Sequence, residues 1–109
     1  MCLIDFSTKK VSAVELANHM KACFINTGDV RTSDYYCGIT NDIQANKTRH
    51  NVDDYVVVCK CPNASIAAEV ETLLGDRDGF DIGKRGEGNG GTDDSVYVYM
   101  YKKTKNTQE

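Results

Sequence analysis

The strongest hydrophobic pattern in the chain is a run of valines within residues 55–61. Apolar residues at successive positions predict a strand that is buried on both faces and therefore lies centrally in a sheet. At residues 95–101, tyrosines alternate with valine and methionine, which predicts a half-buried strand with one tyrosine face. A further strand is predicted at residues 34–40, and apolar residues near the N-terminus predict a short strand or arm.

Helical spacing predicts three helices. Ser12 and Glu15 have the spacing of a capping box, which predicts the start of the first helix. The second helix is expected over roughly residues 42–50, and the third follows the proline at position 62. The apolar stripe of the first helix is expected to contain Val14, Ala17, Met20, Lys21 and Phe24.

Polar residues and one glycine predict the other helix ends. Either Asn41 or Asp42 caps the second helix, and either Asn63 or Ser65 caps the third. Gly75 is predicted to follow the last residue of the third helix.

These elements predict an α+β fold with a small, mainly antiparallel sheet of three to four strands flanked by helices. Residues 1–103 are expected to form a single domain, and residues 104–109 a disordered polar tail. Residues 75–94 carry seven of the nine glycines and are expected to form a loop.

Composition limits the possible functions. The net charge of −3 lacks the basic excess of a tight nucleic-acid binder, although thirteen basic residues can still gather on one face. No segment resembles a signal peptide or a membrane span. The odd count of five cysteines predicts free thiols in a reducing, intracellular compartment, the cytoplasm.

Candidate chemistry begins at the strand of residues 34–40. Tyr36 and Gly38 are two positions apart and share one strand face, and Gly38 lets a ligand or another backbone approach closely. The following helix carries Lys47, Arg49 and His50 toward its end. Tyrosine, bare backbone and basic helix are therefore expected to converge on one site.

This stretch resembles the GIY-YIG endonuclease superfamily in its sequence Tyr36-Cys37-Gly38, in the Ile-Thr-Asn-Asp that follows, and in His50. Residues 68–74 resemble the family's helix with its metal-binding glutamate, which corresponds to Glu71. The resemblance covers roughly residues 34–89. It implies a GIY-YIG-like fold and metal-dependent hydrolysis of phosphodiester bonds, with DNA a better candidate substrate than RNA.

The resemblance also implies roles for individual residues. Tyr36 would act as or assist the general base, or position the water, and His50 would support the phosphate or relay a proton. Glu71 would hold one Mg²⁺ or Mn²⁺ ion. Its helical position also favours it over Glu69, because Glu71 leans toward a flank of small apolar residues whereas Glu69 points outward. The family has an asparagine after its glutamate-bearing helix, and Asn89 is the candidate for it.

Two departures from the family pattern affect the predicted site. The family arginine lies eight positions after the glycine, where this chain has Asn46. Lys47 or Arg49 is a candidate replacement, and each is otherwise a solvated surface charge. An arginine at position 46 is expected to raise a slow rate of cleavage, because asparagine brings no charge to the phosphate.

The second departure is the lack of an upstream Gly-Ile-Tyr strand. We expect the strand at residues 95–101 to take its place, as in a circularly rearranged chain, with Tyr97 or Tyr99 as the first tyrosine. The alternative is a first strand within residues 2–6 or 23–25. The tyrosine row itself is either a surface for stacking bases or ordinary strand packing.

Two functions follow from this pattern. The first is a weak GIY-YIG-like endonuclease in which Tyr36, His50 and Glu71 surround one solvent-open site. The second is a catalytically inactive GIY-YIG-like module that binds nucleic acid or protein. A small structural domain with a chance match to the family is the third reading.

Overall fold

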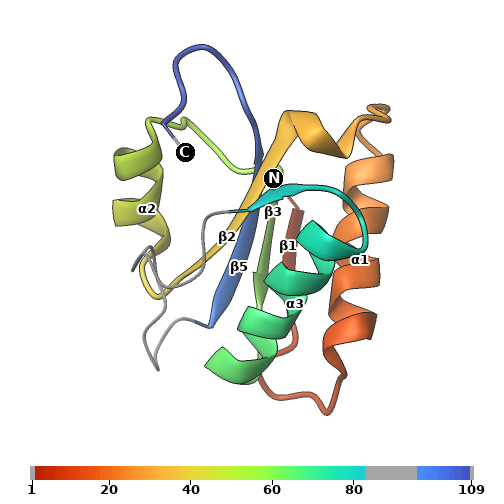
Figure 1. Ribbon diagram of the computed structural model, residues 1–109. Helices are drawn as coiled ribbons and strands as arrows, with labels where there is room; N and C mark the ends of the chain where they lie inside the picture. Colours follow the sequence, from red (N-terminus) through yellow and green to blue (C-terminus); the bar gives the residue numbers. More distant parts are fainter. Residues whose placement is uncertain (1, 83–95, 109) are drawn as a thin grey trace.

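The computed structural model describes residues 2–82 and 96–108. In these residues, three helices and a five-stranded mixed sheet form an α+β fold (Figure 1). The strands are β1 (Cys2–Asp5), β2 (Tyr35–Thr40), β3 (Val57–Lys60), β4 (Asp81–Ile82) and β5 (Tyr97–Lys102). The helices are α1 (Ala13–Ile25), α2 (Ile43–His50) and α3 (Ala64–Asp76), and a 3₁₀ turn (Thr32–Asp34) precedes β2.

The strand order is β1-β3-β5-β2-β4, with β5 in the centre. Strand β5 runs antiparallel to both β3 and β2, whereas β1 pairs with β3 and β4 with β2 in parallel. The sequence predicts three to four mainly antiparallel strands. The described sheet instead has five strands, and two of its four pairings are parallel. The reason is that α1, α2 and α3 each return the chain to the same end of the sheet, so β1 to β4 all run in one direction.

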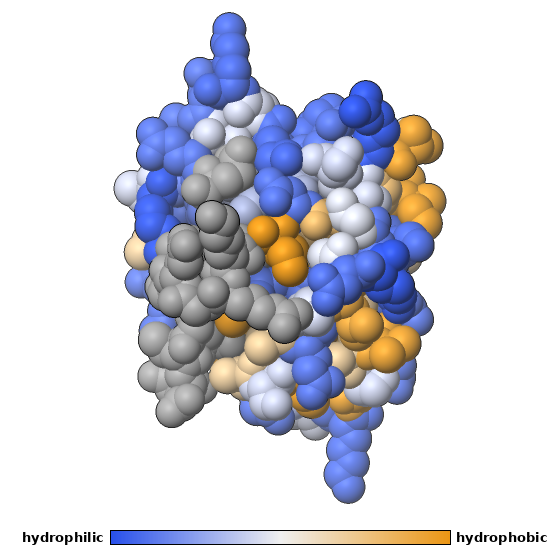
Figure 2. Space-filling model, in the orientation of Figure 1, coloured by the Kyte–Doolittle hydropathy of each residue, from blue (hydrophilic) through white to orange (hydrophobic). Residues whose placement is uncertain are grey.

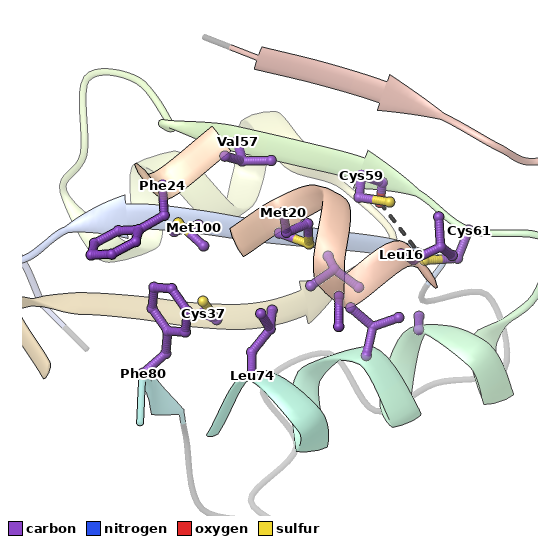
Figure 3. Packing of buried hydrophobic residues seen from close by; sticks show 14 of the residues in the cluster. Leu16, Met20, Phe24, Cys37, Val57, Cys59, Cys61, Leu74, Phe80 and Met100 are labelled. Atoms are coloured by element: carbon purple, nitrogen blue, oxygen red, sulfur yellow. Dashed lines mark hydrogen bonds between the residues drawn. The ribbon is translucent and has the colours of Figure 1, made fainter. Parts of the chain in front are cut away.

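Helices α1 and α3 cover one face of the sheet, and α2 lies on the other face (Figure 1). The main core lies between the sheet and the helices α1 and α3. Figure 3 shows Leu16, Met20 and Phe24 of α1 packed among inward side chains of β2, β3 and β5. The predicted burial of the valine run is confirmed, because Val57 and Val58 are buried on opposite faces of β3.

Helix α1 begins where the capping box predicts. The Ser12 side chain accepts a hydrogen bond from the Glu15 backbone N–H. Val14 was expected in the apolar stripe but is 49% exposed, because the buried stripe starts one position earlier, at Ala13. Val14 is therefore an apolar side chain on the outer side of the helix.

Helix α3 begins at the predicted cap but ends later than expected. The Asn63 side chain accepts a hydrogen bond from the Ile66 N–H. Gly75 lies inside the helix, which continues to Asp76. A Cβ atom at Gly75 would lie 2.8 Å from Cγ1 of Ile82, so the glycine permits close packing of β4 rather than ending the helix.

The C-terminal residues, which are predicted to form a disordered polar tail, contact α2. The Gln108 N–H donates to the His50 carbonyl at 2.7 Å. The Asn51 side chain donates to the Asn106 carbonyl at 2.9 Å. These bonds hold residues 104–108 against the C-terminal end of α2 (Figure 1).

Candidate functional site

A second cluster of buried aromatic side chains fills the space between the sheet and α2. Tyr99 and Tyr101 of β5 point to this face because they alternate with residues that point into the main core. Tyr55 stacks on Tyr99 with 4.7 Å between ring centroids. The His50 ring centroid lies 5.4 Å from that of Tyr36 and 5.7 Å from that of Tyr99. We refer to Tyr36, Tyr55, Tyr99, Tyr101 and His50 as the tyrosine–histidine cluster.

Gly38 allows this cluster to pack. In the antiparallel pairing of β2 with β5, Gly38 lies directly opposite Tyr99. A Cβ atom at position 38 would lie 2.6 Å from Cζ of the Tyr99 ring, which is closer than a real contact permits. A group does approach Gly38 closely, but it is the Tyr99 side chain rather than the ligand or backbone that the sequence predicts.

Hydrogen bonds satisfy the polar groups of the cluster. The Tyr55 hydroxyl donates to Oδ1 of Asn46. The distance from the Tyr99 hydroxyl to Nε2 of His50 is 2.8 Å. Nδ1 of His50 in turn contacts the backbone carbonyl of Gln108 in the tail.

The direction of each hydrogen bond follows from the groups involved. A carbonyl oxygen only accepts, so Nδ1 of His50 carries the proton that is donated to Gln108. In the neutral imidazole, Nε2 then accepts from the Tyr99 hydroxyl. The contacts hold both ring nitrogens of His50 within the protein, and Oδ1 of Asn46 accepts from Tyr55.

The cluster is closed to solvent. Tyr36 and Asn46 are each 3% exposed, and His50 is 2% exposed. Among the described residues, no buried side-chain nitrogen or oxygen lacks a hydrogen-bond partner. The chain thus satisfies these polar groups internally, as stable packing of buried polar atoms requires.

Burial also changes the acidity of the tyrosines. Desolvation raises the pKa of both Tyr55 and Tyr99 well above the ordinary value of 10.0, because a phenolate is poorly solvated in this cluster. For Tyr99 the neighbouring Tyr36 raises the pKa further. Both hydroxyls therefore remain protonated donors throughout the neutral range.

These raised pKa values predict loss of stability at high pH. The unfolded protein loses tyrosine protons near pH 10.0, whereas the folded protein keeps those of Tyr55 and Tyr99. This contribution to stability is fully present below pH 10 and is lost as the pH rises through the raised values. Urea unfolding midpoints measured at increasing pH should fall above pH 10. An unchanged midpoint in strongly alkaline buffer would refute the buried state of these hydroxyls.

Glu71 lies on the other side of the sheet from the cluster. It belongs to α3, which packs against the main core, and its charge contributes to raising the pKa of buried Cys37 after the larger effect of desolvation. Cys37 and Tyr36 are neighbours in β2 and therefore point to opposite faces. The expectation that Tyr36, His50 and Glu71 surround one open site is wrong, because the sheet separates the glutamate from the other two.

The donor set does not fit an Mg²⁺ or Mn²⁺ ion shared by Glu71 and the cluster. The tyrosine–histidine face offers hydroxyls and one imidazole that are already hydrogen-bonded, whereas Mg²⁺ prefers carboxylate oxygens and waters. The described part of the chain contains no group of three or more histidine, cysteine, aspartate or glutamate side chains that fits a metal ion.

The structure places the remaining predicted residues as follows. Lys47 pairs with Asp54 at 3.1 Å, and Arg49 is exposed in the last turn of α2. Tyr97 is half-buried, and the Lys60 ammonium lies over its ring. In the pairing of β2 with β5, Tyr99 and not Tyr97 lies opposite Gly38. Asn89 lies outside the described residues.

Sequence reasoning missed Tyr55, Tyr101 and Gln108 as members of this site. The alternation at residues 95–101 was a usable signal for Tyr101, because it places that residue on the same face as Tyr99. The contact of Gln108 with His50 had no comparable signal, since it joins residues far apart in sequence through a backbone carbonyl.

Comparison with known proteins provides no relative for this site. No protein-family model, curated protein or solved structure significantly matches the chain. No helix among residues 2–82 and 96–108 is long and apolar enough to cross a membrane. Functional inference therefore rests on the geometry of the cluster and of the surface around it.

Proposed function

We propose that this chain is a nucleic-acid-binding domain with a GIY-YIG-like site that does not hydrolyse phosphodiester bonds. The observation that carries the proposal is that buried hydrogen bonds join Tyr55 to Asn46 and Tyr99 to His50 within a cluster closed to solvent. The groups that would act on a phosphate in the family instead bond one another, beneath a covering helix and tail.

The sheet supports the GIY-YIG-like part of the proposal. Strand β5 lies antiparallel beside β2, and Tyr99 faces Gly38 across the pairing. A C-terminal strand in this place is what a circular rearrangement of the family order requires, with Tyr99 as the first tyrosine. His50 completes the group on the same face.

Asn46 supports the absence of hydrolysis. At the position of the family arginine it brings no positive charge, and its side-chain oxygen already accepts a hydrogen bond from Tyr55. Losing a charged group that stabilises a transition state typically costs about 10²- to 10³-fold in rate. An arginine introduced here would be buried without a carboxylate partner among the cluster residues, so Asn46→Arg is now expected to destabilise the fold rather than restore cleavage.

Surface charge supports nucleic acid as the ligand. Lys47 and Arg49 lie in the last turn of α2, and the docked tail brings exposed Lys105 to the same end of the molecule. Figure 2 shows hydrophilic residues over the region in which Figure 1 places α2 and the tail. DNA remains the better candidate through the family resemblance, and five free thiols support a reducing cytoplasmic location.

A binding titration tests this proposal. Fluorescence anisotropy of a short labelled DNA duplex, with a matched RNA duplex, is measured in EDTA at several salt concentrations. We expect the Arg49→Ala/Lys105→Ala variant to bind DNA about tenfold more weakly and to lower the salt slope by about 2. The control is Lys9→Ala/Lys10→Ala, which removes two exposed lysines from the loop before α1 and should bind as the wild type does.

Two outcomes of this titration would overturn the proposal. One is the absence of binding to either duplex at low salt. The other is an equal loss of affinity in both double variants, because it would show charge attraction without a site at α2. In either case, binding to a protein partner becomes the better hypothesis for the function of this domain.

A weak endonuclease is the second candidate, and one observation favours it. Tyr36, Gly38, Tyr99 and His50 gather on a single face, as the family's catalytic groups do. Cleavage would require the tail to leave His50 and a cation such as Lys47 or Arg49 to reach the phosphate. A cleavage assay separates this candidate from simple binding.

A further inference from the structure

Cys2 and Cys23 lie unusually close together. Their sulfur atoms are 2.7 Å apart, although the two residues are separated by 21 positions in sequence. A disulfide bond has a sulfur–sulfur length of about 2.05 Å, so only a small movement separates the thiols from bonding distance. The pair therefore has the separation that intramolecular oxidation requires.

Both cysteines lie on regular secondary structure. Cys2 begins β1, where its N–H donates to the Val56 carbonyl at 2.9 Å and its partner in β3 is Val57. Cys23 lies in the last turns of α1, and both side chains pack against the main core. The backbone on each side is thus fixed by hydrogen bonds, which keeps the two thiols adjacent.

Exposure separates this pair from the other three cysteines. Cys2 and Cys23 are half-buried, so a small reagent can reach them. Cys37 and Cys59 are 0% exposed and Cys61 is 1% exposed. A small oxidant in solution will therefore react at the Cys2–Cys23 pair before it reaches the core.

We propose that Cys2 and Cys23 form a reversible disulfide by exchange with a low-molecular-weight disulfide such as oxidised glutathione. In the first step a thiolate of the pair attacks one sulfur of the reagent, and one glutathione leaves as a thiol. The second cysteine then attacks the mixed disulfide, forms the protein disulfide and releases the second glutathione. The protein loses two electrons and two protons, and the reagent gains both.

The order of the two attacks follows from the surroundings of Cys23. Burial, and after it the hydrogen bond with Cys2, raise the pKa of the Cys23 thiol to about 11. Cys23 is therefore protonated at neutral pH. Cys2 makes the first attack, and Cys23 resolves the mixed disulfide.

The disulfide would attach the edge of the sheet to a helix. Strand β1 pairs only with β3 among the described residues, so one of its edges has no strand beside it. A bond from Cys2 to Cys23 closes a loop that contains the connection between β1 and α1. Closing a loop of this size stabilises the folded state mainly by restricting the unfolded chain. Oxidation would thus fix β1 in place, and reduction would release it.

The test is an oxidation of the folded, full-length chain with oxidised glutathione. Of the five free thiols, we expect two to disappear, leaving 5 − 2 = 3. Peptide mapping without reductant should find the peptide containing Cys2 joined to that containing Cys23. The melting temperature should rise by about 10 °C and return on addition of dithiothreitol.

Matched variants make the assignment specific. Cys2→Ser and Cys23→Ser should each prevent the loss of two thiols and the rise in melting temperature, whereas Cys61→Ala should retain both. Peptide mapping of the oxidised wild-type protein identifies the linked cysteines even if a variant does not fold. Three results would overturn the proposal: a link between other cysteines, a mixed disulfide that never resolves, or a Cys2–Cys23 link that forms only in denaturant.

Discussion

Replacing His50 with alanine is expected to lower the free energy of unfolding by about 4 kcal/mol. The substitution removes a ring that contacts Tyr36, Tyr99 and Tyr101, and it leaves a cavity beneath α2. It also leaves the Tyr99 hydroxyl without its acceptor and frees the tail carbonyl that Nδ1 contacts. Loss of packing and loss of buried hydrogen bonds both act in the same direction.

Urea denaturation followed by circular dichroism measures this effect. The control is His19→Ala, which removes the chain's other histidine from an exposed position on α1 and should cost less than about 1 kcal/mol. Equal and small effects of the two substitutions would show that His50 is not part of a buried network.

Gly38→Ala is expected to destabilise the protein by about 3 kcal/mol, although it adds only one methyl group. The new Cβ would overlap the hydroxyl and ring of Tyr99, which is fully buried. Displacing that ring would also break its bond to His50. The effect is therefore larger than that of an ordinary glycine-to-alanine change in a strand.

A double-mutant cycle identifies the cause of this loss. In a Tyr99→Leu background the shorter side chain relieves the overlap, so Gly38→Ala should cost less than about 1.5 kcal/mol. Identical costs in both backgrounds would show that the backbone of β2, and not Tyr99, is sensitive to the substitution.

Local patterns in the sequence predict most individual elements of this fold. The capping residues Ser12 and Asn63 begin α1 and α3 as expected, and Asp42 is one of the two caps proposed for α2. The valine run forms β3, and the alternating tyrosines form β5. These features depend on neighbours within a few residues, so short-range periodicity is sufficient to find them.

Strand order could not be predicted in the same way. The alternation in β5 indicates two different faces, but it carries no information about which strands lie beside it. Strands β1 and β4 are only four and two residues long, so they show little periodicity of their own. Their parallel places at the edges of the sheet follow from long-range packing of α1 and α3.

The buried face of α2 explains why the candidate site was predicted as open. The helix has few apolar residues, so its basic side chains suggested a solvent-facing, phosphate-binding surface. Asn46 and His50 are four positions apart and form its inward face instead, where tyrosine hydroxyls satisfy them. A polar stripe of this kind is visible in the sequence, but its burial depends on partners from distant strands.

A plasmid-nicking assay with Mn²⁺ tests the central claim, that the tyrosine–histidine cluster is closed and does not hydrolyse nucleic acid. Wild-type protein is incubated with supercoiled plasmid beside Tyr36→Phe, which removes the candidate catalytic hydroxyl and keeps the ring. The account predicts no nicking above the buffer background by either protein, while the anisotropy titration shows binding by the wild type. Sustained nicking by wild type that is lost in Tyr36→Phe would contradict the account and establish the endonuclease reading.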